Sequence, residues 1–480
     1  MNILLVASEA GPFIKTGGLG DVMGALPKEL AKRGHDVRVV IPNYKGILGV
    51  FKEKFEFIKW FNIKVGWRER YVGLFRFYYN GVTYYFIDNQ EYFGREGLYG
   101  YYDDGERFAY FDRAALTFLR QIYWRPDVIH CNDWQTGMIP VMLRMEFYRF
   151  DDFYRGIKTV FSIHNLLFQG CYDPKILPEL FGYNMDMYNN KSLEFDKGVS
   201  FMKGGINYCD KINTVSYTYA NEIMTPEYGE RLDGLMRYRS CDLCGVLNGI
   251  DYDEYNPYTD PFIYEKFGKN PYESKQRNKI ALQKELGLYQ KADTPIISIV
   301  TRLTRQKGID LILYMIDKLL YNRDVQFVVL GSGDKDYEDA FWRLKDRHGD
   351  KVSINIKFDN GLAHKIYTAS DMFMMPSKFE PCGLGQLIAL RYGTIPIVRE
   401  TGGLKDTVTP YNEYTGIGNG FSFANFNGEE LLNTTNYALS IYWDKWRWNS
   451  IINQAMNSDN SWQRSAGRYE QLYKEALNWY

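Results

Sequence analysis

The sequence lacks an apolar run of 18 residues, the length that a membrane-spanning helix needs. Residues 1–6 have neither the basic start nor the long apolar core of a secretory signal peptide. Six cysteines in 480 residues do not make a disulfide framework. These features predict a cytoplasmic protein that has no membrane partner.

Net charge is also nearly absent, because 58 Lys and Arg residues face 59 Asp and Glu residues. A chain without an overall electrostatic field does not recruit nucleic acid or an acidic membrane as a whole. Any anionic ligand must therefore be captured by a local group of cations. We expect no nucleic-acid partner.

Several nucleotide and metal motifs are missing. The dinucleotide fingerprint G-x-G-x-x-G and the P-loop G-x-x-x-x-G-K-[ST] do not occur, and there is no convincing Asp-x-Asp motif. Cys241 and Cys244 form a single C-x-x-C pair, but no further ligands follow at the spacing of a zinc site. We expect neither a metal nor redox chemistry there.

Aromatic residues, in contrast, are abundant: 40 Tyr, 30 Phe and 10 Trp make up 17% of the chain. Tyr and Trp suit carbohydrate binding, because the ring faces pack on sugar C–H groups while the polar edge forms hydrogen bonds. The alternative is a biased composition that only fills the cores.

The order of elements predicts an α/β protein with two Rossmann-like domains. Short apolar strands alternate with helices in residues 2–163, and the same pattern restarts in residues 295–398. An aromatic, β-rich insertion is expected at residues 51–87. The expected strands are 2–8, 36–42, 127–131, 158–163, 295–301, 325–330, 352–358, 371–375 and 395–398, and the expected helices include 21–33, 109–122 and 308–320. We place the first domain at 1–247 and the second at 248–460, facing a deep inter-domain cleft.

In such sheets, ligands bind beyond the carboxyl ends of the strands, so the residues that follow strands are the candidates for a site. Lys15, Gly17 and Gly18 lie between the first strand and the first helix. Glycines let backbone N–H groups approach an anion, and the start of the helix adds positive potential. The alternative is a turn that only packs the helix on the sheet.

Arg302 and Lys307 follow a strand of the second half and lie five residues apart. A guanidinium that forms bidentate contacts and a compact ammonium can both address one diphosphate. The alternative is a pair of solvated cations at the start of a helix.

Further polar groups follow three more strands. Glu380 precedes a helix, where the carboxylate can hold sugar hydroxyls while the backbone N–H groups of 383–385 meet phosphate; it can equally cap that helix. His164 and Asn165 end one strand and His130 ends its neighbour. Two of five histidines at adjacent strand ends favour a site over a purely structural role.

Taken together, these segments resemble one family. The ordered set consists of Lys15-Thr16-Gly17-Gly18-Leu19, Phe161-Ser162-Ile163-His164-Asn165, Asn248-Gly249-Ile250-Asp251, Arg302-Leu303-Thr304-Arg305-Gln306-Lys307-Gly308, Phe379-Glu380-Pro381-Cys382-Gly383-Leu384, Thr401-Gly402-Gly403-Leu404 and Ser461-Trp462-Gln463. It is similar to the bacterial glycogen synthase and starch synthase family over essentially the whole chain. Each motif is weak alone, but their order is specific.

The resemblance implies a GT-B fold and a retaining α-1,4-glucosyltransferase of glycogen biosynthesis. The implied donor is ADP-glucose, the implied acceptor is an α-1,4-glucan, and no metal or other cofactor is required. It also implies that residues 461–480 form a helix that crosses back onto the first domain.

The resemblance further assigns roles to residues. Lys15, Arg302 and Lys307 would contact the diphosphate near the backbone of Gly17 and Gly18. Glu380, His164 and Asn248 would hold the donor glucose, and Asp133 would lie near the reacting centre. The remaining matches are Tyr99, which would reach into the closed cleft, Phe358, which would stack on adenine, and the binding residues Asn165, Cys382, Gly383 and Leu384.

Two positions depart from related patterns. Gly385 replaces the usual hydroxyl residue, which keeps a backbone contact but removes a side-chain one. Ile388 stands where several GT-B relatives repeat a glutamate, and this fits the bacterial glycogen synthase branch. A GT-B enzyme with a UDP-sugar donor and a non-catalytic glucan-binding homologue remain alternatives. The sequence leaves open whether the chain forms a homo-oligomer.

Overall fold

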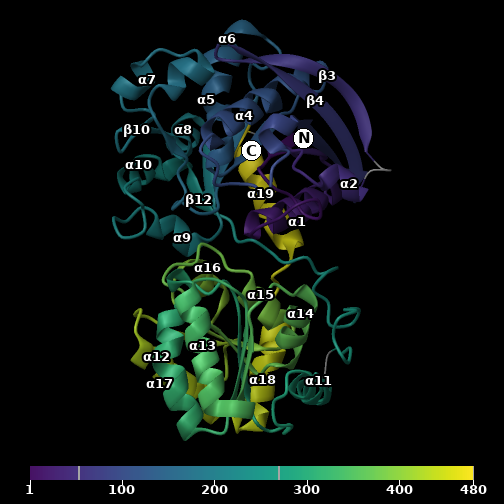
Figure 1. The fold of residues 1–480 in the computed structure, drawn as a ribbon, viewed down its shortest axis with the longest axis vertical. Coiled ribbons are helices and arrows are strands. Elements are labelled where there is room, and N and C mark those ends of the chain that lie inside the picture. The colour runs from purple at the N-terminus through teal and green to yellow at the C-terminus, as the bar shows by residue number, and fades with distance from the viewer. Residues whose placement is uncertain (52–54, 269–270, 479–480) are drawn as a thin grey trace. The chain divides into compact units, whose positions relative to one another are not determined.

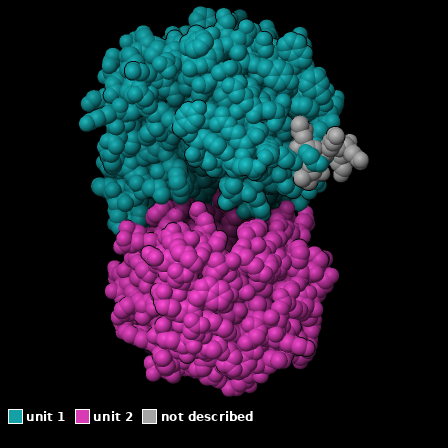
Figure 2. All heavy atoms as spheres, viewed as in Figure 1, with its two compact units in different colours: residues 1–215, 220–247, 462–480 teal, residues 216–219, 248–461 magenta. Residues whose placement is uncertain are grey.

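A computed structural model describes residues 1–51, 55–268 and 271–478 (Figure 1). The described chain divides into two compact units, coloured separately in Figure 2. Unit 1 comprises residues 1–215, 220–247 and 462–480, and unit 2 comprises residues 216–219 and 248–461. Each unit is built on a largely parallel sheet covered by helices, which confirms the predicted α/β class. No helix in the described ranges is both long enough and apolar enough to cross a bilayer.

The described residues of unit 1 form a nine-stranded sheet in the order β12-β11-β7-β6-β1-β2-β5-β4-β3. Its strands are β1 (Asn2–Val6), β2 (Asp36–Pro42), β3 (Glu56–Val65), β4 (Arg68–Tyr79), β5 (Val82–Asp88), β6 (Val128–Asn132), β7 (Lys158–Ile163), β11 (Lys211–Thr214) and β12 (Leu243–Gly245). The strands from β12 to β5 pair in parallel. Helices cover both faces of such a sheet, which is why its central strands are continuous apolar runs.

The segment expected as an insertion is part of this sheet. Strand β5 pairs in parallel with β2 and extends it, and β4 and β3 then add an antiparallel hairpin at the edge. The aromatic alternation of residues 56–88 therefore reflects a continuation of the core. Residues 52–54 of the predicted insertion lie outside the described residues.

Besides a small antiparallel sheet of β8 (Cys171–Tyr172), β10 (Gly198–Ser200) and β9 (Glu194–Phe195), unit 1 contains helices. They are α1 (Gly18–Lys32), α2 (Ile47–Phe51), α3 (Gln90–Phe93), α4 (Asp104–Gln121), η2 (Trp134–Thr136), α5 (Met138–Met142), η3 (Leu143–Phe147), α6 (Tyr148–Phe150), η4 (Leu177–Phe181), α7 (Asp186–Asn189), α8 (Phe201–Tyr208), α9 (Tyr217–Glu222), α10 (Asp233–Tyr238), η5 (Ser240–Asp242) and α19 (Trp462–Ala476). The first three residues of α9 belong to unit 2 and the remainder to unit 1.

In unit 2 the described residues form a six-stranded parallel sheet in the order β15-β14-β13-β16-β17-β18. The strands are β13 (Ile296–Val300), β14 (Gln326–Leu330), β15 (Val352–Asn355), β16 (Met372–Met375), β17 (Ile395–Arg399) and β18 (Phe421–Phe423). The helices are α11 (Tyr272–Glu285), η6 (Arg305–Lys307), α12 (Ile309–Asn322), α13 (Lys335–His348), η7 (Gly349–Lys351), α14 (Asn360–Ala369), α15 (Gly385–Arg391), α16 (Gly402–Thr407), α17 (Gly428–Tyr442) and α18 (Lys445–Met456).

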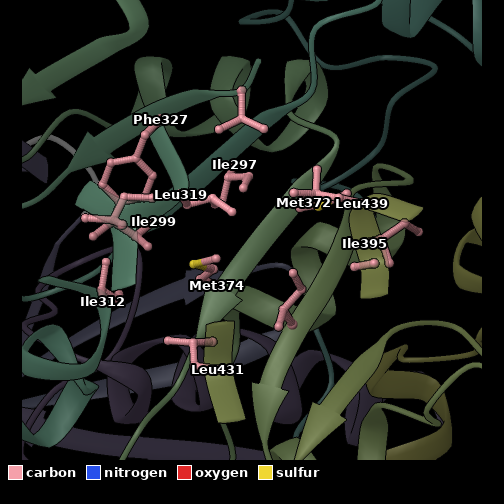
Figure 3. Close-up of a cluster of buried hydrophobic side chains, with 14 of the residues drawn as sticks. Ile297, Ile299, Ile312, Leu319, Phe327, Met372, Met374, Ile395, Leu431 and Leu439 are labelled. Atoms are coloured by element: carbon pink, nitrogen blue, oxygen red, sulfur yellow. The ribbon is translucent and has the colours of Figure 1, made fainter. Parts of the chain in front are cut away.

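The main core of unit 2 lies between this sheet and the helices α12, α13, α17 and α18. Figure 3 shows strand residues such as Ile297, Phe327 and Met374 meeting Leu319 and Leu431 from the covering helices. Complete burial of these side chains is the main favourable term that holds the strand ends in place.

The strand expected at 352–358 ends early, at Asn355. Asp359 caps α14 through a hydrogen bond of 2.9 Å from the Leu362 backbone N–H to its carboxylate. The three residues between Asn355 and this cap turn from strand to helix, and apolar content alone could not reveal that turn.

Helix α19 packs on α1 and closes unit 1 through a buried chain of hydrogen bonds. Asn213 accepts a hydrogen bond from Ser162 (2.6 Å), so Ser162 accepts one from His130 Nε2 (2.5 Å). His130 Nδ1 is then the acceptor for the Tyr473 hydroxyl of α19, at 2.7 Å. Burial lowers the pKa of His130 to about 3, so this ring is neutral and serves the fold.

We expect Tyr473→Phe to destabilise unit 1 by about 1–3 kcal/mol, because the buried His130 nitrogen loses its donor. Urea unfolding followed by tryptophan fluorescence measures the loss. Tyr238→Phe is the matched control, since the Tyr238 side chain is largely exposed. An unchanged unfolding midpoint for Tyr473→Phe would show that this hydrogen bond contributes nothing to stability.

Candidate active site

In unit 2, the turn after β13 presents the two predicted cations. Arg302 is exposed, and Lys307 ends the short helix η6. Gly308 follows with φ of +72°, and a Cβ there would lie 2.1 Å from the Pro376 carbonyl oxygen. Glycine is therefore required, and it lets the turn after β13 lie directly against the loop after β16.

That close approach brings Lys307 to Glu380. The Lys307 Nζ lies 2.5 Å from Glu380 Oε2, and the Ser377 hydroxyl donates to the same oxygen at 3.1 Å. Glu380 is 7% exposed. A buried carboxylate needs a compensating charge, and Lys307 supplies it here.

Arg399, at the end of β17, fixes the loop that carries Glu380. Its guanidinium donates to the carbonyl oxygens of Ser377 (3.0 Å), Lys378 (2.5 Å) and Ala424 (3.1 Å). Several donors on one rigid side chain hold the loop in a single conformation. The Glu380 carboxylate is therefore positioned before any ligand arrives.

The Gly402-Gly403 pair lets α16 approach the same loop. A Cβ on Gly402 would lie 2.0 Å from the Glu380 carbonyl oxygen, and one on Gly403 would lie 2.1 Å from that of Cys382. The Gly403 N–H also donates to the Glu380 carbonyl oxygen at 3.1 Å. A larger residue would clash at either position, which explains why the motif has glycine at both.

Asn248 and Cys382 lie together in the same unit. The Asn248 backbone N–H faces the Cys382 thiol, and burial raises the pKa of that thiol to about 12, so it stays neutral. Among the described residues, the buried Oδ1 of Asn248 has no hydrogen-bond partner. An orphaned buried acceptor costs free energy unless a ligand supplies a donor.

The other predicted residues of unit 2 lie on loops. Gly383 has φ of +76°, and Leu384 directly precedes the seven-residue helix α15. The backbone N–H groups of this turn are the donors that the segment presents to an anion. Phe358 is 90% exposed, between β15 and α14. Its ring is available for stacking but is not positioned by packing.

In unit 1, a buried carboxylate shapes the glycine turn after β1. Glu9 accepts hydrogen bonds from the Thr16 N–H (2.7 Å), the Thr16 hydroxyl (2.8 Å) and the Gly20 N–H (3.2 Å). Burial is the main reason that its pKa is raised. Lys15, on the exposed side of the turn, pairs with Asp21 at 2.8 Å.

Gly17 has no packing reason to be glycine. Its φ of −165° is open to any residue, and a Cβ there would meet nothing within 4 Å. Gly20, in contrast, would place a Cβ 2.3 Å from that of Lys15. Packing of the helix therefore does not require a glycine at position 17, whereas it does at position 20.

Asp133 is strained and desolvated. It follows β6 with φ of +58° and ψ of −178°, a conformation that residues other than glycine seldom adopt. Its Oδ1 accepts hydrogen bonds from the backbone N–H of His164 (2.7 Å) and, at 3.5 Å, of Asn165. Burial raises the pKa of Asp133 from its ordinary value of 3.8 to about 7.

His164 has a defined tautomer. Asn132 donates through Nδ2 to the carbonyl oxygens of Val6 (3.0 Å) and His130 (3.2 Å), so its Oδ1 accepts from His164 Nε2 at 2.9 Å. Burial lowers the pKa of His164 to about 4, so the ring is neutral near pH 7. Its Nδ1 is left as an acceptor, which suits a sugar hydroxyl.

Two further predicted residues of unit 1 have local partners. The Tyr99 hydroxyl lies 2.8 Å from the Ser8 hydroxyl, beyond the end of β1, and burial raises the pKa of Tyr99. The Asn165 side-chain oxygen accepts from the Leu167 N–H at 3.1 Å and closes its own turn. The side-chain oxygen of Asn165 is therefore used within the chain.

Comparisons with known proteins agree along the chain. A model described as the starch synthase catalytic domain matches residues 2–238, and one described as glycosyl transferases group 1 matches residues 284–450. A glycogen synthase of Clostridium beijerinckii is 63% identical over 475 residues, covering 99% of each chain. The chain belongs to the glycogen synthase and starch synthase family.

Two solved structures show the same fold. The catalytic domain of starch synthase IV from Arabidopsis thaliana, bound to ADP and acarbose, superposes with a TM-score of 0.90 at 33% identity and covers 99% of each chain. A sucrose-phosphate synthase from Thermosynechococcus elongatus has a TM-score of 0.63 at 16% identity, with 99% of each chain covered, and shares the fold. The predicted GT-B fold and the predicted family are thereby confirmed, and the chain is a glycosyltransferase.

Within each unit the structure brings several predicted residues of this family site together. Lys307 meets Glu380, and Asn248 meets Cys382; in unit 1, Asp133 contacts the backbone of His164 and Asn165. Phe358, which is 90% exposed, belongs to neither of these groups. Cys241 is exposed and Cys244 partly buried, and in the described ranges no group of three His, Cys, Asp or Glu side chains is placed to hold a metal ion.

Sequence reasoning missed the residues that hold this site in shape, above all Glu9, Asn132 and Arg399. The signal for Glu9 was its position at the end of the first strand, seven residues before Thr16. Asn132 and Arg399 also end strands, but their hydrogen bonds go mainly to carbonyl oxygens that lie 21–126 positions away. Such partners become visible once the fold is known.

We expect Asp133→Asn to become increasingly stabilising as pH rises. The folded-state pKa of Asp133 is above its ordinary value, so its carboxylate is disfavoured in the fold, and the free energy of unfolding decreases as pH rises from about 4 to about 7. The uncharged amide removes this loss. Melting temperatures of both proteins at pH 5 and pH 8 measure the effect, and a constant difference between variant and parent would contradict the raised pKa.

Proposed function

We propose that this chain transfers glucose from ADP-glucose to the non-reducing end of an α-1,4-glucan, with retention of configuration, in the glycogen biosynthesis of the cytoplasm. The observation that carries the proposal is the buried Lys307–Glu380 pair at the strand ends of a chain 63% identical to a glycogen synthase over its full length. ADP in the starch synthase IV structure supports the choice of nucleotide.

We assign the leaving diphosphate to Arg302 and Lys307. When the C1–O bond breaks, negative charge grows on the departing phosphate oxygen, and preorganised cations stabilise it. Arg302 is exposed and can turn to the phosphates, while Lys307 is held in place by Glu380. We propose that these side chains supply the charge that a divalent metal supplies in other transferases.

We assign the donor sugar to Glu380 and Asn248. The Glu380 carboxylate keeps acceptor capacity beside Lys307, and the unpartnered Oδ1 of Asn248 is a second buried acceptor. Sugar hydroxyls are the donors that match both groups. Backbone N–H groups at Gly383 and Leu384 would contact phosphate, with Cys382 supporting the turn, and Phe358 would stack on adenine.

We assign the groups of unit 1 to the reacting centre and to the phosphates. Nδ1 of neutral His164 accepts a hydrogen bond from a sugar hydroxyl. Asp133, whose pKa is about 7, accepts a hydrogen bond from the His164 backbone N–H. Tyr99 and Asn165 complete the sugar contacts, while Lys15, Gly17 and Gly18 add a second set of phosphate donors. In the same-face route that we favour, the acceptor hydroxyl gives its proton to the departing phosphate oxygen.

We expect the purified protein to release ADP when it is incubated with ADP-glucose and glycogen. UDP-glucose should give a much lower rate, and a chelator should leave the rate unchanged if the cations replace a metal. Nucleotide release and incorporation of labelled glucose measure both. A preference for UDP-glucose would support the alternative donor, and no transfer at all would support a glucan-binding homologue.

We expect Arg302→Ala to lower turnover by on the order of 10²–10³-fold, as expected when one transition-state donor is lost. Arg305→Ala is the matched control, because Arg305 is a nearby, largely exposed arginine whose ion partner is Asp310. Glu380→Gln should also lose most activity while keeping its melting temperature. Near-normal turnover in purified Arg302→Ala would contradict the diphosphate assignment.

Lys15 can be tested in the same series. If Lys15 and Arg302 stabilise the same phosphate charge, the double alanine variant should lose less than the sum of the two single losses in activation free energy. Strict additivity would assign Lys15 to a separate role.

A further inference from the structure

The loop that joins α3 to α4, residues 94–103, carries Tyr99 close to two glycines in the left-handed region. Gly97 has φ of +75° and Gly100 has φ of +92°, and a Cβ at either position would meet no described atom within 4 Å. Glycine is therefore required there by the backbone and not by packing. A segment with glycine on both sides has many backbone conformations open to it. The direction of the Tyr99 side chain thus depends on what fixes the backbone around it.

A buried ion pair at the start of α4 holds the backbone on both sides of Tyr99. Arg107 Nη1 donates to Asp104 Oδ1 at 2.5 Å and to the Leu98 carbonyl oxygen at 3.1 Å. The other carboxylate oxygen of Asp104 accepts from the Gly100 N–H at 2.8 Å and from the N–H of the next residue at 3.3 Å. The residue before Tyr99 and the residue after it are therefore bonded to the same pair.

Arg107 is itself fixed by the elements around it. Its Nε donates to the Tyr92 carbonyl oxygen of α3 at 2.8 Å. Its guanidinium lies 4.9–5.5 Å from the ring centroids of Tyr101, Phe93 and Phe108. Because a guanidinium is a planar, rigid fork, one such group can hold several acceptors in a single geometry. The loop is thus tied to both α3 and α4 through one side chain.

Stability alone does not explain this pair. Arg107 is 0% exposed and Asp104 is 6% exposed, and a buried ion pair often stabilises a fold no better than apolar residues of similar size. Among the described residues, the buried Nη2 of Arg107 also has no hydrogen-bond partner, which costs free energy. The pair does determine which backbone groups of the loop are bonded, and so it fixes the conformation of the loop.

The fixed loop places the Tyr99 hydroxyl among the candidate site residues of unit 1. That hydroxyl lies 2.8 Å from the buried Ser8 hydroxyl, which directly precedes Glu9. The Tyr99 ring lies against Phe108 of α4, with centroids 6.2 Å apart. Burial is the main reason that the pKa of Tyr99 is raised, and the carboxylates of Glu9 and Asp133 contribute. The hydroxyl therefore keeps its proton and can both donate to and accept from a sugar hydroxyl.

We propose that Asp104 and Arg107 are positioning residues, which touch no ligand and act by fixing the Tyr99 hydroxyl where the sugar is bound. The proposal rests on the proposed function, which places a sugar beside Tyr99. A loop that already has its bound conformation loses little conformational entropy when the sugar arrives, so more of the binding energy lowers the barrier. Loss of the pair therefore weakens the contacts of the sugar and leaves those of the nucleotide unchanged.

The test is Asp104→Asn in a double-mutant cycle with Tyr99→Phe. The amide keeps the size of the side chain but cannot accept from both Arg107 and the loop N–H groups, so kcat/KM for ADP-glucose should decrease by about tenfold to 100-fold. In the Tyr99→Phe background the same substitution should change kcat/KM by less than about twofold, because the hydroxyl that the pair positions is already absent. The inhibition constant of ADP should not change, since ADP lacks the glucose that is transferred.

Glu146→Gln is the matched control. Glu146 pairs with Arg113, another arginine of α4, at 2.7 and 2.9 Å, more than a turn further along the helix. Its loss should lower the melting temperature without changing kcat/KM. Arg107→Lys is a second variant, which keeps the charge but loses the fork that joins Asp104 to the Leu98 carbonyl oxygen. It should reproduce the loss in kcat/KM, and it carries the test alone if Asp104→Asn does not fold.

Hydrogen exchange gives a readout that needs no transfer activity. The amide hydrogens of residues 97–101 should exchange at least about tenfold faster in Asp104→Asn than in the parent protein, and at the parent rate in Glu146→Gln. Unchanged exchange would overturn the proposal. So would equal losses of kcat/KM in the two Tyr99 backgrounds, or a loss of ADP affinity that matches the loss of kcat/KM. Failure of the proposed function is distinct: the parent protein would then transfer no glucose, while the exchange rates would still show whether the pair holds the loop.

Discussion

The candidate site residues of unit 1 and those of unit 2 both depend on parallel strand pairing. A parallel strand can return to its sheet only through a crossover, so every strand-to-helix turn emerges at one edge. In unit 2 this rule gathers Arg302, Lys307 and Glu380, which are up to 78 positions apart in the numbering, at the ends of neighbouring strands. In unit 1 it does the same for Asp133 and His164. The candidate site residues lie at these edges because the topology places the strand-to-helix turns there.

The residues gathered there carry a cost in stability. Asp133 combines an unfavourable backbone conformation with a desolvated carboxylate. Asn248 has a buried acceptor without a partner among the described residues, and Glu380 depends on Lys307 for its counter-charge. Such features persist when the surroundings over-determine them. Here the supports are apolar strand cores and the hydrogen bonds from Arg399 and Asn132. The arrangement agrees with a protein that holds polar groups ready for a ligand.

Much of this could be predicted from the sequence, because the strands are continuous apolar runs and the site residues follow them directly. The ranges 36–42 and 158–163 agree with the structure residue for residue. The β-rich character predicted for 51–87 is confirmed for the described residues, but these strands extend the main sheet. Alternating aromatic residues look the same in an inserted hairpin and in a continuation of the sheet. Register and partner choice between distant strands are not local properties, and a single sequence does not contain them in readable form.

The residues that hold the candidate site in shape were harder to predict than the residues proposed to contact the ligand. Motif residues such as Lys307 and Glu380 are recognisable because they are charged and follow a strand. His130 was an equally plausible site residue from its sequence position, but in the structure it holds α19 in place. Their difference lies in burial and in the identity of the hydrogen-bond partner. Both depend on distant chain segments: Glu380 lies 73 positions from Lys307, and Tyr473 lies 343 positions from His130.

The membership of α19 in unit 1 has a consequence for how the protein is made. Ribosomes deliver the chain from the amino terminus, so the strands β6, β7 and β11 emerge long before the helix that satisfies His130 and Asn213. All of unit 2 is synthesised in between. Part of the unit 1 sheet therefore stays uncovered until unit 2 has been synthesised and α19 has emerged. The first unit to begin folding is the last to finish.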